Sequence, residues 1–102
     1  MYVVLLTYTA PLEEIDYNLA DHVAWVTKHY EAGLFLASGR RDPRTGGVII
    51  TRPMSRDKLN VLLATDPLAL RHLVHYEVIA FTATRTCREL AAYNEALADQ
   101  TT

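Results

Sequence analysis

The sequence has little cysteine and no long hydrophobic run. Its single cysteine, Cys87, cannot form a disulfide within the chain, and a lone thiol fits a reducing compartment. The apolar N-terminal run covers only residues 1–6 and has no basic segment before it. This run is too short for a signal-peptide core or a membrane span, so we expect a cytoplasmic protein without a membrane partner.

The sequence also lacks an excess of charge of either sign. Twelve acidic and ten basic residues give a net charge of -2, which provides no electrostatic reason to expect a nucleic-acid partner. Half of the 102 residues are hydrophobic, enough for the core of a single domain over 1–102. Because a chain of this length buries only about 60–70% of its unfolded surface, a second subunit covering one face would stabilise it.

Hydrophobic periodicity predicts a strand followed by a long helix. Residues 2–9 are mostly β-branched, apolar or aromatic and predict a strand buried on both faces. From residue 13 to about residue 30 the apolar period becomes helical, and Gly33 supplies a stop. The side chains expected on the inward stripe of this helix are Ile15, Leu19, Val23, Val26 and Tyr30.

The rest of the chain completes a β-α-β-β-α-β order, typical of a ferredoxin-like α+β fold. A turn rich in Gly, Pro and Asp over 39–47 indicates a hairpin, Ser55 is a suitable N-cap, and Asp66-Pro67 starts a short helix. The core covers 2–82, and capping-box spacing from Thr86 predicts a further C-terminal helix. The remaining elements are strands at 34–38, 48–52 and 75–82 and helices at 55–64 and about 87–99.

Four segments carry a resemblance to a known family. They are Asp21-His22-Val23, the run YEAGLFLASG from Tyr30 to Gly39, Asp66-Pro67-Leu68, and the run VHYEVIAF from Val74 to Phe81. Together, in this order and spacing over roughly residues 2 to 82, they resemble the YCII-like proteins.

The resemblance implies a fold, an assembly and a site. It implies a dimeric α+β barrel, in which the sheets of two subunits pack face to face. It implies an active site that pairs the helix histidine with the aspartate of the Asp-Pro segment, here His22 and Asp66. It further implies an activity such as dehydrochlorination of a chlorinated hydroxyhydroquinone in aromatic catabolism. Asn18 stands where the family commonly has an arginine.

The residues themselves allow the same chemistry for the dyad. His22, Trp25 and His29 lie on one flank of the long helix, at i, i+3 and i+7. An imidazole at the core boundary suits proton transfer because its pKa lies near working pH. Asp66 would orient the ring and stabilise its protonated form. The structural alternative is a boundary histidine that only packs and an aspartate that only caps a helix.

Five further residues are candidates for substrate contacts. Ser38 and Tyr76 offer hydroxyl groups to a substrate oxygen, Arg40 offers charge to an enolate or phenolate, and Trp25 offers a flat apolar wall. Gly39 follows Ser38 at the end of the same predicted strand. Each has a structural alternative, namely a strand end, a solvated charge or an ordinary core aromatic.

Metal and cofactor motifs are weak or missing. His72 and His75 form a His-x-x-His pair that crosses a predicted helix–strand boundary, with no cluster of further ligands, so we expect no metal site. No glycine-rich phosphate loop has the required spacing. We therefore expect an enzyme without a cofactor that transfers a proton, with elimination or isomerisation of an oxygenated cyclic or aromatic substrate.

The alternative function is a non-catalytic dimer that binds a ligand or a protein through the same cleft. A hydrogen bond between His22 and Asp66 beside a pocket would favour the enzyme. Separation of the two side chains, or their enclosure in the core, would favour the binding domain.

Overall fold

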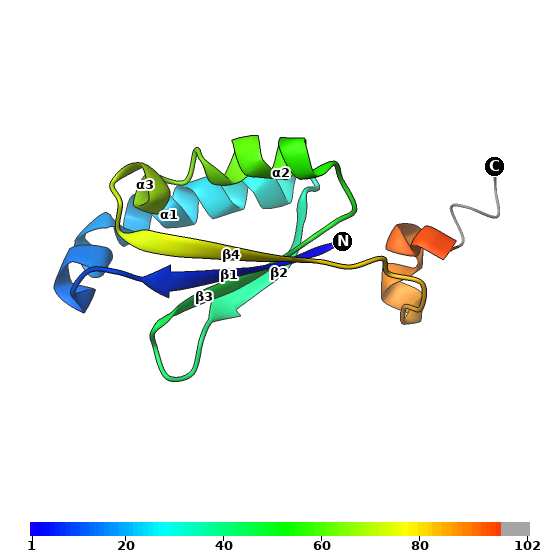
Figure 1. Cartoon of the computed structure of the whole chain (residues 1–102), viewed down its shortest axis with the longest axis horizontal. Coiled ribbons are helices and arrows are strands. Elements are labelled where there is room, and N and C mark those ends of the chain that lie inside the picture. Colours follow the sequence, from blue (N-terminus) through cyan, green and yellow to red (C-terminus); the bar gives the residue numbers. More distant parts are fainter. Residues whose placement is uncertain (97–102) are drawn as a thin grey trace.

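The protein is a mixed α+β domain with helices on one face of an antiparallel sheet. The structure is a computed structural model that describes residues 1–96. The elements are β1 (Tyr2–Tyr8), α1 (Leu12–Glu31), β2 (Phe35–Arg40), β3 (Gly46–Thr51), α2 (Arg56–Leu63), α3 (Pro67–Leu70), β4 (Val74–Ala80) and a 3-10 helix η1 (Arg88–Tyr93). Figure 1 shows α1, α2 and α3 as one layer over the sheet, whose strand order is β2-β3-β1-β4, and η1 beyond the end of the sheet. This topology confirms the predicted ferredoxin-like β-α-β-β-α-β fold.

Strand β1 lies in the middle of the sheet and is covered on one face only. Val4 and Leu6 point towards the helices and are almost fully buried. The alternate residues Val3 and Leu5 are half-buried and Thr7 is exposed. The prediction of burial on both faces was therefore wrong for the isolated chain. Side chains alternate along a strand, and the helices cover only one side.

Helix α1 is rotated relative to the predicted inward stripe. Ile15 is buried as expected, but Val23 is 53% exposed and Tyr30 is 38% exposed. The flank that packs into the core instead carries Trp25 and His29, which are 7% and 8% exposed. The large aromatic rings bury more surface than the valine side chains would, which favours this rotation.

Strand β3 begins two residues earlier than predicted, at Gly46. A Cβ atom at Gly46 would lie 1.7 Å from the main-chain oxygen of Leu6, so only glycine allows the strand to pair with β1 at this point. Two glycines that the sequence suggested as turn residues therefore belong to the sheet.

The caps of α2 and α3 confirm the predicted helix starts. The hydroxyl oxygen of Ser55 accepts from the Lys58 N–H at 3.2 Å, and the leucines of α2 at 59, 62 and 63 are buried. Asp66 caps α3 through the Leu68 N–H, with Pro67 at the first helical position.

The C-terminal helix differs in type from the prediction. Its described part is a 3-10 helix from Arg88 to Tyr93 without a buried residue, and residues 97–99 of the predicted range lie outside the described chain. Cys87 occupies the N-cap position, and no side chain caps the helix. Because a short helix needs packing to be stable, an α-helix has little support here. Within residues 1–96 no helix is both long and apolar enough to cross a membrane.

Candidate active site

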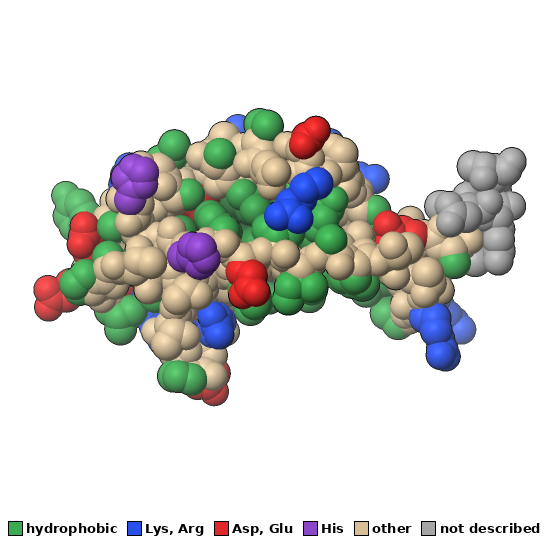
Figure 2. Space-filling model, viewed as in Figure 1, with side chains coloured by type: hydrophobic (Ala, Val, Ile, Leu, Met, Phe, Trp, Pro, Cys, Tyr) green, Lys and Arg blue, Asp and Glu red, His purple; other side chains and the backbone are tan. Residues whose placement is uncertain are grey.

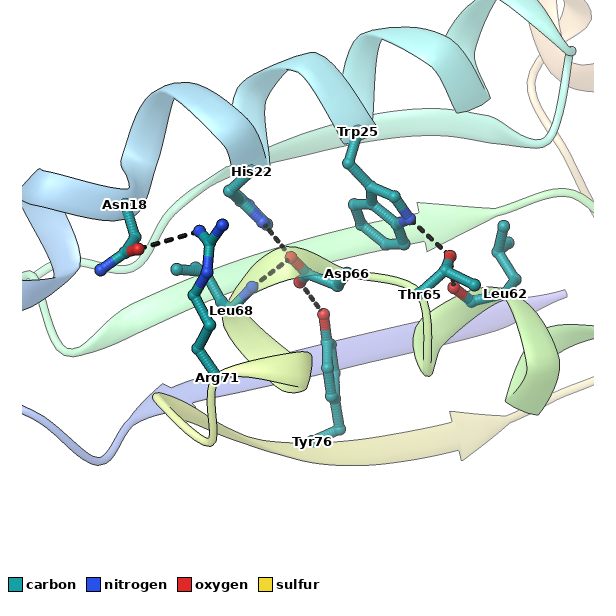
Figure 3. Close-up of polar contacts among 9 residues, drawn as sticks. All are labelled: Asn18, His22, Trp25, Leu62, Thr65, Asp66, Leu68, Arg71 and Tyr76. Atoms are coloured by element: carbon teal, nitrogen blue, oxygen red, sulfur yellow. Dashed lines mark hydrogen bonds and ion pairs between the residues drawn. The ribbon is translucent and has the colours of Figure 1, made fainter.

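His22 and Asp66 form a hydrogen-bonded pair between α1 and the start of α3. The imidazole Nδ1 of His22 lies 2.9 Å from Oδ1 of Asp66 (Figure 3). Asp66 is fully buried, whereas the His22 side chain is 16% exposed. The pair therefore joins a carboxylate in the interior to a ring at its boundary.

The Asp66 carboxylate is well supplied with donors. Besides His22, its Oδ1 accepts from the Leu68 N–H at 3.0 Å, and its Oδ2 accepts from the hydroxyl of Tyr76. Burial, followed by the charge of Asp66, raises the pKa of Tyr76 far above its usual value, so this hydroxyl stays protonated and remains a donor. A buried carboxylate is tolerated when such donors satisfy its oxygens.

Trp25 supports the His22 ring from one turn further along α1. Its ring is stacked with that of His22, with 5.9 Å between centroids, and its Nε1–H donates to Oγ1 of Thr65 at 2.8 Å. The Thr65 hydroxyl in turn donates to the Leu62 main-chain oxygen at 2.6 Å (Figure 3). This chain of bonds joins α1 to the end of α2 and fixes the position of the Trp25 ring next to His22.

A cavity of about 460 Å³ lies between α1 and the β2–β3 side of the sheet, and we call it the α1 cavity. Its wall is mostly apolar. From α1 it is lined by Leu19, His22, Val23, Val26, Thr27 and Tyr30. From the sheet and the β2–β3 turn it is lined by Leu6, Tyr8, Ser38, Gly39, Arg40, Arg44, Gly46, Gly47, Val48 and Ile49. His22 thus belongs to both the cavity and the dyad.

The structure brings only some of the predicted substrate contacts to this cavity. Ser38, Gly39 and Arg40 line it, but Trp25 and Tyr76 do not. The Tyr76 hydroxyl is directed to Asp66, and Trp25 is buried against Thr65 and the core. Both aromatics therefore contact the dyad, because they lie on the side of His22 that faces the core.

Sequence reasoning missed several residues around the site. The Tyr30 hydroxyl lies 2.7 Å from Oγ of Ser38 across the cavity mouth, whereas Tyr30 had been assigned to the core. Arg71, at the end of α3, donates to Asn18 at 2.8 Å and to Asp21 at 3.0 Å, which attaches α3 to α1. No local sequence pattern marks these pairs, because the two members of each pair are separated in the sequence and meet only in the folded chain.

His29 lies outside the α1 cavity, two turns beyond His22. It packs edge-on against Trp25 and close to Phe35, and its buried Nε2 has no hydrogen-bond partner within residues 1–96. Burial, with a smaller contribution from Lys28, lowers the pKa of His29 below 6.5. In residues 1–96 no group of three or more His, Cys, Asp or Glu side chains is placed to hold a metal ion.

Comparison with known proteins places this site in a family. The YCII-related domain family matches residues 1–82, which include both members of the dyad. The chain belongs to the YCII family. A solved structure of similar fold is 5-chloro-2-hydroxyhydroquinone dehydrochlorinase (TftG) from Burkholderia phenoliruptrix AC1100, in complex with 2,5-dihydroxybenzoquinone. It has a TM-score of 0.65 and 19% identity, over 79% of this chain and 93% of that one. No curated protein matches the sequence.

Proposed function

We propose that this YCII protein is an enzyme without a cofactor that transfers a proton to or from a small oxygenated ring bound in the α1 cavity, with His22 as the catalytic residue. The observation that carries the proposal is the placement of one histidine ring. Its Nδ1 is held by a buried carboxylate while the same side chain lines a cavity. A pair enclosed in the core would have no such access to a ligand.

The hydrogen bond to Asp66 selects the tautomer of the neutral ring that a base requires. A carboxylate accepts, so Nδ1 of the neutral ring carries the hydrogen and Nε2 keeps a lone pair. No hydrogen bond to Nε2 is found among the described residues, which leaves this atom for a ligand. When Nε2 takes a proton, the charge of Asp66 stabilises the imidazolium that forms.

Elimination of hydrogen chloride from a hydroxylated, chlorinated ring is the most concrete reaction of this kind. His22 would remove the proton, the electron pair would form a new π bond, and chloride would leave with the electrons of the carbon–chlorine bond. A tautomerisation would use the same base and return the proton to another atom. The fold shared with a dehydrochlorinase and the mostly apolar cavity support this substrate class.

The Tyr30–Ser38 pair has one hydroxyl hydrogen available for the substrate in this proposal. Either Tyr30 or Ser38 can donate in the bond between them, so one of the two hydroxyl hydrogens remains free to bind a substrate oxygen. Gly39 and Arg40 border the same part of the cavity. Trp25 and Tyr76 would act through His22 and Asp66 instead of touching the substrate.

We also propose that the protein forms a homodimer through the sheet face opposite the helices. This face carries the half-buried Val3, Leu5 and Ile50, together with Ile79 and Phe81, which are 46% and 44% exposed. Figure 2 shows hydrophobic side chains on the side of the strands away from the helices. Soluble monomers rarely leave an apolar patch of this kind in water. Light scattering should give a dimer, and a stable monomer of 11.5 kDa would contradict it.

The non-catalytic alternative is less well supported. The dyad is hydrogen-bonded, and His22 lines a cavity instead of being enclosed in the core. This is the arrangement expected of the enzyme.

Chloride release from chlorinated hydroxyhydroquinones tests the reaction. The wild-type protein should release chloride, and His22→Ala should lower the rate by about 100- to 10,000-fold, the usual contribution of a general acid–base. His72→Asn is the matched control, because His72 is exposed between α3 and β4, does not line the cavity, and has a positive φ that asparagine tolerates. Absence of chloride release by the wild type would exclude dehydrochlorination. Equal rates in His22→Ala and the wild type would exclude His22 as the proton carrier.

A further inference from the structure

The α1 cavity is electropositive although the whole chain is slightly acidic. Among the described residues that line it, two are arginines and none is an aspartate or glutamate. Arg44 forms an ion pair with Asp16, which lies outside the cavity wall, and its guanidinium lies 6.0 Å from the ring centroid of Tyr8. The side chain of Arg40 makes no hydrogen bond or ion pair within residues 1–96, although its charge helps to lower the pKa of Asp16. The single carboxylate of Asp16 therefore neutralises only one of the two guanidinium charges, and a net positive charge remains beside the cavity.

The side chain of Arg40 lies on the helix side of the sheet. Ser38 reaches Tyr30 of α1, and Arg40 is two residues further along the same strand, so both side chains point to the same face. Opposite Arg40 on β3 is Gly47, which has no side chain to cover the guanidinium. The next arginine, Arg41, points away from the cavity, towards Thr7 on the other face.

We propose that the α1 cavity selects an organic anion, a planar ring with one anionic oxygen group placed at Arg40 and the reacting part of the ring placed at His22. This inference rests on the proposed function only in assigning the ligand to the same cavity. A guanidinium whose hydrogen-bond donors have no acceptor within residues 1–96, at the edge of an apolar cavity, binds a carboxylate or phenolate by charge-assisted hydrogen bonds. Arg40 thus determines specificity for charge, and His22 supplies the chemistry.

Matched charged and neutral ligands test the inference by calorimetry or NMR titration. Benzoate is compared with benzamide, and 4-nitrophenolate with 4-nitroanisole, so the two pairs distinguish carboxylate from phenolate. We expect at least one anion to bind about 10-fold or more tightly than its neutral partner, and to shift the resonances of Ser38 and Val26. The preference should disappear in Arg40→Gln. It should persist in Arg41→Gln, which removes the same charge from the opposite face of the sheet.

Three results would overturn the inference. They are equal binding of the charged and neutral partners, an unchanged preference in Arg40→Gln, and no binding of either anion. The outcome is separate from that of the proposed function. His22→Ala should lose turnover while keeping the preference for the anion. If His22→Ala loses turnover but neither it nor the wild type prefers the anion, the proposed role of His22 stands and the role of Arg40 is refuted.

Discussion

The two flanks of helix α1 have opposite character although one helix builds both. The flank with Trp25 and His29 is buried, and its side chains pack against aromatic rings or bond to Thr65, just after α2. The flank with Val23 and Tyr30 is partly exposed and lines the α1 cavity. His22 lies between them, bonded to Asp66 on one side and bordering the cavity on the other.

In the proposed mechanism, this difference would separate the positioning of the base from its access to substrate. Groups on the buried flank hold the imidazole, and groups on the cavity flank would determine which molecule reaches it. A rigid set of contacts behind a catalytic group keeps its geometry while the ligand side stays open. Substitutions on the two flanks should therefore change different quantities.

The largest loss of kcat is expected for substitutions in the pair formed by His22 and Asp66, where the two flanks of α1 meet. Asp66→Asn keeps the size of the side chain but removes the negative charge that supports the imidazolium. On a substrate that the wild type turns over, we expect kcat to fall by about 100-fold or more, with the fold retained by circular dichroism. The same loss is expected for His22→Ala. Variants that lose thermal stability but keep wild-type kcat would show that the dyad is structural.

A second pair of variants compares the flanks directly. Trp25→Ala removes a buried ring and the donor to Thr65, so the free energy of unfolding should fall by about 3–5 kcal/mol. Val23→Ala, on the cavity flank, should cost less than about 1 kcal/mol because that side chain is already half exposed. Urea titration of both variants measures the difference. Similar losses would mean that the two flanks are equally part of the core.

The hydroxyl of Tyr76 offers a smaller test of the buried flank. Tyr76→Phe removes one donor to the buried carboxylate and keeps the ring, so we expect a loss of stability of about 1–3 kcal/mol. Because the ring of Tyr76 does not line the cavity, KM should change much less than kcat. If KM rose while kcat stayed constant, Tyr76 would be a substrate contact after all.

We expect His29, on the buried flank, to make the free energy of unfolding depend on pH. Its pKa is lowered in the folded state, so below pH 6.5 the unfolded chain binds more protons and stability falls with decreasing pH until the folded-state pKa is passed. One proton gives a slope of at most about 1.4 kcal/mol per pH unit. Urea titrations from pH 7.5 to 5 should show a shallower slope for His29→Leu. Equal slopes for the wild type and His29→Leu would mean that another group causes the loss of stability at acidic pH.

The fold and the dyad could be predicted from the sequence because their signals are local or family-wide. The strands, the cap at Ser55 and the Asp-Pro helix start follow from short-range patterns. The rotation of α1 could not be predicted, because an aliphatic stripe and an aromatic flank share the helix and only the packing of distant leucines decides between them. The C-terminal segment also depends on packing that the sequence pattern does not include.

The tautomer of the neutral His22 ring decides whether Nε2 is free to act as the base. Nitrogen-detected NMR of a selectively labelled sample, near neutral pH, distinguishes hydrogen on Nδ1 from hydrogen on Nε2. We expect the neutral ring to carry its hydrogen on Nδ1 in the wild type, to lose that preference in Asp66→Asn, and to show a shift at Nε2 when 2,5-dihydroxybenzoquinone is added. A wild-type ring with hydrogen fixed on Nε2, or an Nε2 that no quinone perturbs, would contradict the role of His22 as the base.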